Sequence, residues 1–87
     1  MKQIKEEILE KHCFTELVYE RINKKLESRF SKKESELLIK NVIKETEIAF
    51  FNKKGKNFYI SNKVKNMRIT VNSNTFRIIT VDVLNKK

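Results

Sequence analysis

Hydrophobic positions in the first half of the chain recur every three to four residues, which is the spacing of an amphipathic helix. Three such segments follow one another. The first covers residues 1–12, and the second runs from Thr15 to about Arg29. The third continues from Ser31 towards Lys44. The pattern therefore predicts three consecutive helices before residue 46.

Two of these helices have recognisable starts in the sequence. Ser31 and Glu34 form a Ser-x-x-Glu capping box, in which each side chain bonds the backbone N–H of the other residue. Thr15 can cap the start of the second helix. Phe14, the residue just before this cap, can pack on Tyr19 as a hydrophobic staple.

After residue 46 the hydrophobic period shortens to two, which is the spacing of β-strands. Strands are predicted at residues 48–51, 57–61, 67–72 and 75–83. The turns between them are expected at residues 53–56 around Gly55, at 62–66 and at Ser73-Asn74. We expect one domain, residues 1–87, with a helical part at 1–46 and an antiparallel sheet at 47–84. This order predicts an α+β fold, in which two to three helices pack on one face of a four-stranded antiparallel meander.

A two-residue turn at Ser73-Asn74 would fix the register of the last hairpin and place Thr70 opposite Arg77. One face of the hairpin would then be apolar and covered by the helices, with Met67, Ile69, Val71, Phe76 and Ile78. The opposite, open face would carry Arg68, Thr70, Asn72, Thr75 and Arg77, with Ile79, Val81 and Val83 further along. Tyr59 joins the open face if its neighbours Phe58 and Ile60 point to the core.

The charge of the chain lies mostly in its second half. Twenty Lys and Arg against eleven Asp and Glu give a net charge of +9. Residues 50–87 hold nine Lys and Arg and one acid, Asp82, which nets +8, so residues 1–49 net only +1. A stretch this poor in acids indicates a polyanionic partner such as nucleic acid. The alternative is a lysine-rich surface that serves only solubility.

Several other classes of protein and site do not fit the sequence. No apolar run is long enough to span a bilayer, and the acids near the N-terminus argue against a signal peptide, so we expect a cytoplasmic protein. Cys13 is the only cysteine, and we expect it to be half-buried beside His12 at a helix end. Asp82 alone cannot hold Mg²⁺, so we expect no metal site and no cofactor.

The open face offers groups that suit RNA, because Arg binds phosphate with two parallel N–H bonds and Tyr stacks on bases. The predicted nucleic-acid-binding residues are Lys53, Lys54, Lys56, Lys63, Lys65, Arg68, Thr70, Thr75 and Arg77. The sequence leaves open whether the protein is an enzyme. If it is, we expect a metal-independent endoribonuclease with Arg68, Arg77 and Tyr59 as catalytic residues. Arg would stabilise the pentacovalent phosphate, and Tyr or a Lys would move protons.

Three stretches resemble a family of small Firmicute proteins known only as a domain of unknown function. They are TELVYERIN at residues 15–23, KGKNFYI at 54–60 and NSNTFRIITVD at 72–82. The order of helices and basic sheet also resembles the RelE/colicin-type RNase toxins. That likeness implies a toxin–antitoxin role, with Arg68 and Arg77 binding phosphate and Tyr59 as acid or base. The chain lacks the first strand of those toxins and their C-terminal Tyr or His.

The sequence thus favours a small basic protein that binds RNA or another polyanion. The alternative is a non-enzymatic phage- or mobile-element-type inhibitor or interaction protein, which binds a host protein or nucleoprotein complex. A protein partner would then be an antitoxin or a host target, and no membrane partner is expected. A homodimer through Ile79, Val81 and Val83 is a third alternative.

Overall fold

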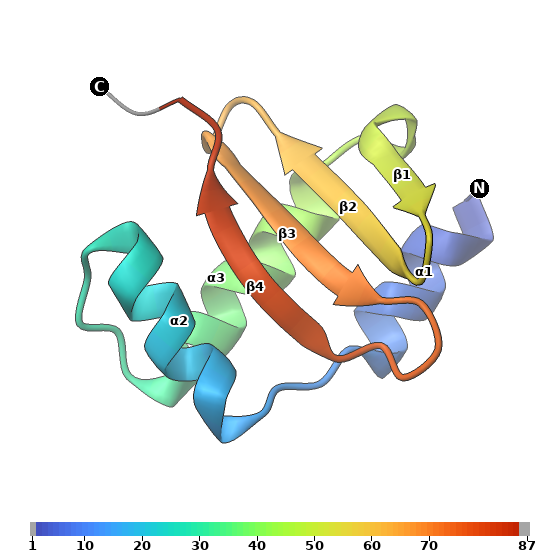
Figure 1. The fold of residues 1–87 in the computed structure, drawn as a ribbon. Helices are drawn as coiled ribbons and strands as arrows, with labels where there is room; N and C mark the ends of the chain where they lie inside the picture. The colour runs from blue at the N-terminus through green and yellow to red at the C-terminus, as the bar shows by residue number, and fades with distance from the viewer. Residues whose placement is uncertain (1, 86–87) are drawn as a thin grey trace.

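The computed structural model describes residues 2–85 and shows helices followed by an antiparallel sheet (Figure 1). The helices are α1 (Lys2–Lys11), α2 (Glu16–Leu26) and α3 (Lys32–Glu45), and a short 3-10 turn, η1, covers Ile48–Phe50. The strands are β1 (Phe51–Lys54), β2 (Asn57–Asn62), β3 (Met67–Asn72) and β4 (Ile78–Val83). They form one sheet in the order β1-β2-β3-β4. This order confirms the predicted α+β fold with an antiparallel meander. The first helix was predicted from residue 1, which lies outside the described residues.

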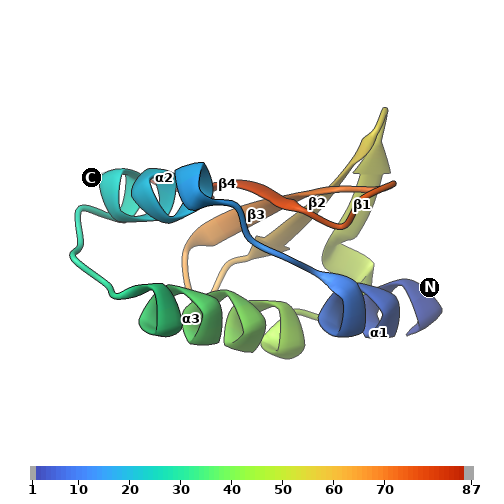
Figure 2. The ribbon, with the colours of Figure 1, turned by 90° about the horizontal axis from the view of Figure 1, so that it is seen from below.

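The helices leave one face of the sheet open. Figure 2 shows α1 and α3 on one side of the sheet and α2 beside the edge strand β4. Besides the buried Val18 and Ile22, two polar contacts attach α2 there: Arg21 Nη1 donates to the carbonyl oxygen of Ile79 at 3.2 Å, and Lys25 Nζ lies 3.0 Å from Asp82 Oδ1. An uncovered edge strand is a template for unwanted pairing, so α2 protects β4 while it leaves the face opposite α3 free.

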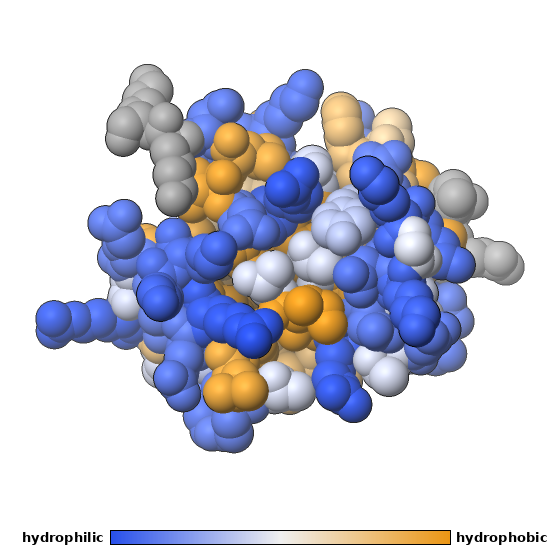
Figure 3. All heavy atoms as spheres, in the orientation of Figure 1, coloured by the Kyte–Doolittle hydropathy of each residue, from blue (hydrophilic) through white to orange (hydrophobic). Residues whose placement is uncertain are grey.

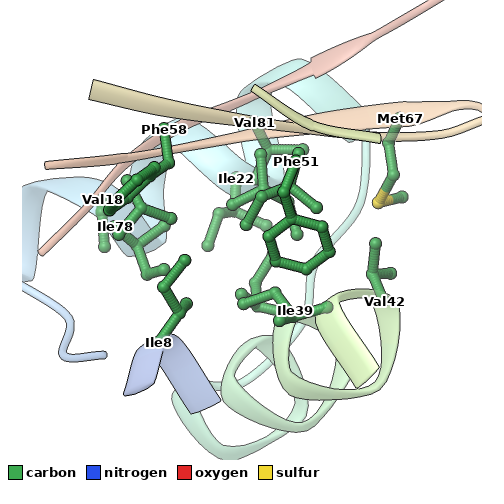
Figure 4. Close-up of a cluster of buried hydrophobic side chains, with 14 residues drawn as sticks. Ile8, Val18, Ile22, Ile39, Val42, Phe51, Phe58, Met67, Ile78 and Val81 are labelled. Carbon is green, nitrogen blue, oxygen red and sulfur yellow. The ribbon is translucent and has the colours of Figure 1, made fainter. Parts of the chain in front are cut away.

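The core lies between the sheet and the helices (Figure 4). Its side chains are apolar, and most of them are branched at Cβ. They are Ile8, Val18, Ile22, Ile39, Val42 and Ile43 from the helices, and Phe51, Phe58, Ile60, Met67, Ile69, Val71, Ile78 and Val81 from the strands. Burying each such side chain contributes about 1.5–3 kcal/mol, so this layer supplies most of the favourable free energy of folding.

The local helix signals are confirmed in part. Ser31 Oγ accepts from the Glu34 N–H at 3.1 Å, and Glu34 Oε1 accepts from the Ser31 N–H at 2.8 Å, which completes the capping box. The Phe14 and Tyr19 rings stack with centroids 5.5 Å apart, as the staple predicts. The Thr15 side chain makes no capping hydrogen bond, however.

The predicted first strand is wrong. Residues 48–50 form η1, and the strand begins only at Phe51. Pairing of Lys54 with Asn57 shortens the turn to Gly55-Lys56, because Gly55 takes a φ of +63°, which suits a tight hairpin. The strand was predicted at residues 48–51, but β1 covers Phe51–Lys54, so it begins three residues later and ends at the turn.

The predicted turn between β3 and β4 is also wrong. The Asn72 side-chain oxygen accepts from the N–H groups of Asn74 and Thr75 at 2.8 and 2.9 Å, which makes a longer loop. Phe76 then takes a φ of +59°. Cys13 pairs with this segment as a short parallel bridge, since its N–H donates to the Phe76 carbonyl at 3.0 Å and its carbonyl accepts from Ile78 N at 2.9 Å.

The longer loop changes the register of the hairpin. Thr70 lies opposite Thr80 and not opposite Arg77, and a bulge follows between Thr70 and Val71. Val81 is therefore fully buried against the core, and Val83 pairs with the buried Met67. Two of the three residues of the apolar patch expected for a homodimer, Val81 and Val83, therefore share the face of the core residues Ile69 and Met67 and do not lie on the open face.

Candidate nucleic-acid interface

The open face of the sheet is formed by the residues that alternate with the core positions. They lie in three rows across the strands: Lys54, Asn57 and Asn72; Asn52, Tyr59, Thr70 and Thr80; and Ser61, Arg68 and Asp82. Figure 3 views the molecule from this side and shows a mainly hydrophilic surface with pale side chains near its middle, and with hydrophobic side chains beside them and at the upper and lower edges. The face is polar, with one aromatic ring among these rows.

Tyr59 and Arg68 are in contact near the centre of this face. Arg68 pairs with Ser61 and Tyr59 with Thr70, so the two side chains are diagonal neighbours on adjacent strands. The Arg68 guanidinium carbon lies 6.0 Å from the centroid of the Tyr59 ring, within range of a cation–π interaction. Arg68 is exposed and Tyr59 is half-buried. The structure therefore brings together two of the three residues predicted to be catalytic.

Arg77 lies at the other end of the sheet from Arg68. Its carbonyl oxygen accepts from the Asn72 N–H at 2.9 Å, and Asn72 is four residues beyond Arg68 on β3. Four residues of strand span about 13 Å, whereas the predicted register would have made the two arginines diagonal neighbours. Arg77 is exposed.

Asp82, the only acid in residues 50–87, lies opposite Arg68 on β4 but bonds Lys25 of α2 instead. Within residues 2–85, Arg68 makes no ion pair with a carboxylate. Sequence reasoning missed the role of Lys25, because the contact joins residues 57 positions apart and has no local signal. The ion pair leaves the Arg68 guanidinium free for an anionic ligand.

The lysines predicted to bind nucleic acid divide between the two ends of the strands. Lys54 is the last residue before the β1–β2 turn and Lys56 lies in the turn. The Lys56 carbonyl accepts from Ser73 N at 2.8 Å, which places Thr75 of the β3–β4 loop at the same end. Lys53 pairs with the buried Phe58, so its side chain alternates to the helix side of the sheet.

Lys63 and Lys65 lie at the opposite end, in the β2–β3 turn. The Lys63 ammonium is 5.9 Å from the Phe50 ring centroid, and Lys65 is 3.9 Å from the Glu45 carboxylate. Between them Val64 is 91% exposed.

One predicted contact residue is not accessible. Thr70 lies between Tyr59 and Thr80 in the middle row and is only 5% exposed. A side chain this buried cannot contact a ligand on the open face, so Thr70 is not part of the interface proposed below.

His12 and Cys13 lie away from this face. His12 Nδ1 is 2.8 Å from the Ile8 carbonyl oxygen and 3.0 Å from that of Leu9, so it serves as the donor that caps the end of α1. Cys13 is exposed, and the expectation of a half-buried thiol is wrong, because the backbone of residue 13 pairs with the β4 end and leaves the side chain outside.

No group of three or more His, Cys, Asp or Glu side chains among the described residues could hold a metal ion. No helix in residues 2–85 has the length and apolar character needed to cross a membrane.

Comparison with known proteins adds a family assignment without an activity. No curated protein and no solved structure matches the chain. A family model with the description "Protein of unknown function (DUF3781)" matches residues 6–82.

Proposed function

The chain belongs to the DUF3781 family of proteins of unknown function, and we propose that it binds single-stranded RNA on the open face of its sheet. The observation that supports this proposal is the contact between Tyr59 and Arg68 on a face that the helices leave uncovered. An aromatic ring beside a free guanidinium can stack on a base and bond the adjacent phosphate.

The contact prepares both side chains for such a ligand. With the guanidinium already 6.0 Å from the ring centroid, the two groups need little rearrangement to bind together, so less side-chain entropy is lost on binding. Single strands expose the faces of their bases, whereas a duplex hides them in its stack, so a stacking residue favours a single-stranded ligand.

The lysines extend the positive field along the strands. Lys54 and Lys56 lie at one end of β2, and Lys63 and Lys65 lie at the other, about 17 Å away for a six-residue strand. A single strand that follows β2 across Tyr59 would meet cations at both ends. Contacts of this kind are independent of sequence and weaken with salt.

We propose binding and not cleavage. Cleavage of the predicted kind needs both arginines and the tyrosine around one phosphate. The backbones of Arg68 and Arg77 are separated by about 13 Å along the sheet. Arg77 is better placed to contact a different phosphate of a bound strand than to share one with Arg68.

Fluorescence anisotropy with a labelled single-stranded RNA of about 16 nucleotides tests the proposal. We expect saturable binding at about 50 mM salt and much weaker binding at about 200 mM. Tyr59→Ala should weaken binding by about tenfold, since losing a base stack costs about 1–3 kcal/mol. Arg68→Ala should weaken it by a similar factor, since a hydrogen bond between charged groups contributes about 1.5–3 kcal/mol. Circular dichroism should show unchanged folding for both variants.

Lys44→Ala is the matched control, because Lys44 is an exposed cation on α3, away from the open face. It removes the same charge and should change binding by less than about twofold. The proposal is wrong if the wild type does not bind at low salt, or if Lys44→Ala weakens binding as much as Arg68→Ala does.

A further inference from the structure

A second candidate site lies on the helical side of the molecule. A groove of about 660 Å³ is bounded by the α1–α2 linker, the start of α2 and one face of α3. Figure 2 shows this linker crossing from α1 to α2. The groove shares no residue with the open face of the sheet, and its volume is within the usual range for small-molecule sites.

The apolar wall of the groove is built from rings that hold one another in place. Phe14 stacks on Tyr19 with an interplanar angle of 15°, and His12 meets Phe14 edge-on with centroids 5.6 Å apart. The Lys32 ammonium lies 5.5 Å from the Tyr19 centroid. Because these contacts occupy ring faces, a ligand would meet mainly ring edges here.

Leu37 provides an apolar surface on the α3 side of the groove. It is 60% exposed, although a leucine of this size gains free energy from burial. Leu17 on α2 is 64% exposed but does not line the groove, which makes it a useful comparison.

The polar groups of the groove are arranged around α3. Lys33 and Lys40 are seven residues apart on this helix, or about 10.5 Å along its axis, and both line the groove. Neither pairs with a carboxylate within residues 2–85. Glu36 lies between them in sequence and accepts a hydrogen bond from the Tyr19 hydroxyl. Two ammonium groups and one carboxylate therefore line the groove, and their charges sum to +1.

We propose that this groove binds a small amphiphilic organic anion. The apolar body of the ligand would cover Leu37 and the ring edges, and its carboxylate or sulfonate would lie beside Lys33 or Lys40. Apolar surface with a few convergent polar groups is the usual composition of a small-molecule site. Burial first, and then the hydrogen bond to Glu36, raise the pKa of Tyr19 to about 12, so its hydroxyl stays protonated and neutral at the groove. This proposal does not depend on RNA binding.

The probe for the test is 8-anilinonaphthalene-1-sulfonate, an aromatic sulfonate whose fluorescence rises in apolar surroundings. We expect saturable binding of one probe per native chain. Leu37→Ser should weaken it by about tenfold, whereas Leu17→Ser, an equivalent change at a similarly exposed leucine, should leave it unchanged. Equal effects of the two substitutions would overturn the proposal.

The contribution of the two lysines that line the groove, Lys33 and Lys40, is tested separately. The double variant Lys33→Ala/Lys40→Ala should weaken probe binding by about fivefold. The control Lys24→Ala/Lys44→Ala removes the same charge from exposed positions that do not line the groove. It should have no effect. If both double variants weaken binding equally, the sulfonate responds only to net charge and the groove is not its site.

Cys13 provides a direct report of location, since it lines the groove and is the only thiol of the chain. N-ethylmaleimide should alkylate it more slowly, by about fivefold or more, when the probe is saturating or when decanoate replaces the probe. Slower alkylation supports the site. Bound probe with an unchanged alkylation rate would place the ligand elsewhere and overturn the proposal.

Discussion

The guanidinium of Arg68 lies over the ring of Tyr59, with its central carbon 6.0 Å from the ring centroid, although the two residues belong to different strands. Their register on β2 and β3 makes the contact, and the ion pair between Asp82 and Lys25 leaves Arg68 without a carboxylate partner. The pair is the most specific feature of the open face.

Conservative substitutions should separate stacking from hydrogen bonding at this pair. Tyr59→Phe keeps the ring and should retain RNA binding within about twofold, whereas Tyr59→Leu should lose about tenfold, because only an aromatic ring stacks on a base. Anisotropy titrations at fixed low salt measure both. Similar losses for Phe and Leu would show that the ring is not a stacking platform.

At position 68 we expect RNA affinity to depend on the two parallel N–H bonds that a guanidinium can donate to phosphate, as well as on its charge. Arg68→Lys keeps the charge but binds phosphate through a single ammonium, so its affinity should fall between those of the wild type and Arg68→Ala. The dependence of affinity on salt should stay as in the wild type for Arg68→Lys and become shallower for Arg68→Ala. Equal slopes for the two variants would contradict a phosphate contact at this residue.

Tyr19 should ionise at unusually high pH. Burial, the hydrogen bond to Glu36 and the nearby negative charges of Glu36 and Glu16 raise its pKa to about 12 from 10.0. Glu36→Gln removes one of these charges and should lower the pKa. A titration by ultraviolet absorbance measures the shift, with Tyr59→Phe as the background so that Tyr19 is the only tyrosine observed.

The same shift affects stability in a defined pH range. Because the folded pKa is raised, the native state favours protonated Tyr19, and this contribution is fully present below pH 10. It is lost as the pH rises towards 12. The free energy of unfolding should therefore fall less steeply across this range in Glu36→Gln. An identical fall in both proteins would contradict the role of Glu36.

The elements that sequence could predict are those specified by local contacts. The capping box at Ser31 and Glu34 and the staple between Phe14 and Tyr19 use residues within five positions of one another. Apolar and polar residues alternate along β3, and this alternation predicted the bounds of the strand. It also predicted that Arg68 lies on the face of the sheet away from the core. These signals also placed Tyr59 and Arg68 together on the open face.

The β3–β4 loop and the register of β4 could not be predicted, because they depend on contacts between distant parts of the chain. The Ser73-Asn74 pair suits a two-residue turn, but the Asn72 side chain caps a longer loop, and Cys13 pairs with the segment at Phe76 and Ile78. No periodicity in the sequence indicates that bridge. The longer loop moves Arg77 away from Thr70, which separates the two arginines of the predicted site.

Asn62 should be important for stability, because its buried amide joins two parts of the chain. Its Nδ2 donates to Thr46 Oγ1 at 3.0 Å, and its Oδ1 accepts from Lys65 N at 2.9 Å. Asn62→Ala would leave the Lys65 N–H without this partner and should lower the free energy of unfolding by about 1–3 kcal/mol. Urea denaturation measures the change.

Asn52→Ala is the control for that substitution, since Asn52 is exposed on β1. It should change stability by no more than about 0.5 kcal/mol. If both substitutions cost the same, the hydrogen bonds of Asn62 do not contribute specifically.

Glu27 is a position where a substitution should stabilise the protein. It ends α2 with a φ of +53°, and its N–H donates to the Asn23 carbonyl, as in a helix that is terminated by a left-handed residue. Glycine adopts this conformation without the strain that a Cβ atom imposes, and Glu27 is exposed. Glu27→Gly should raise the free energy of unfolding by about 0.5–1 kcal/mol in urea denaturation.

The opposite result is expected for the same substitution about two turns before the end of the helix. Glu20 is exposed inside α2, where glycine costs about 1 kcal/mol relative to a good helix former. Glu20→Gly should therefore destabilise the protein while Glu27→Gly stabilises it. The two variants lose the same charge and gain the same residue, so a difference in sign reports the position in the helix, which combines the left-handed backbone at residue 27 with its negative charge at the C-terminal end of the helix dipole. Destabilisation of similar size at both positions would show that Glu27 is not strained.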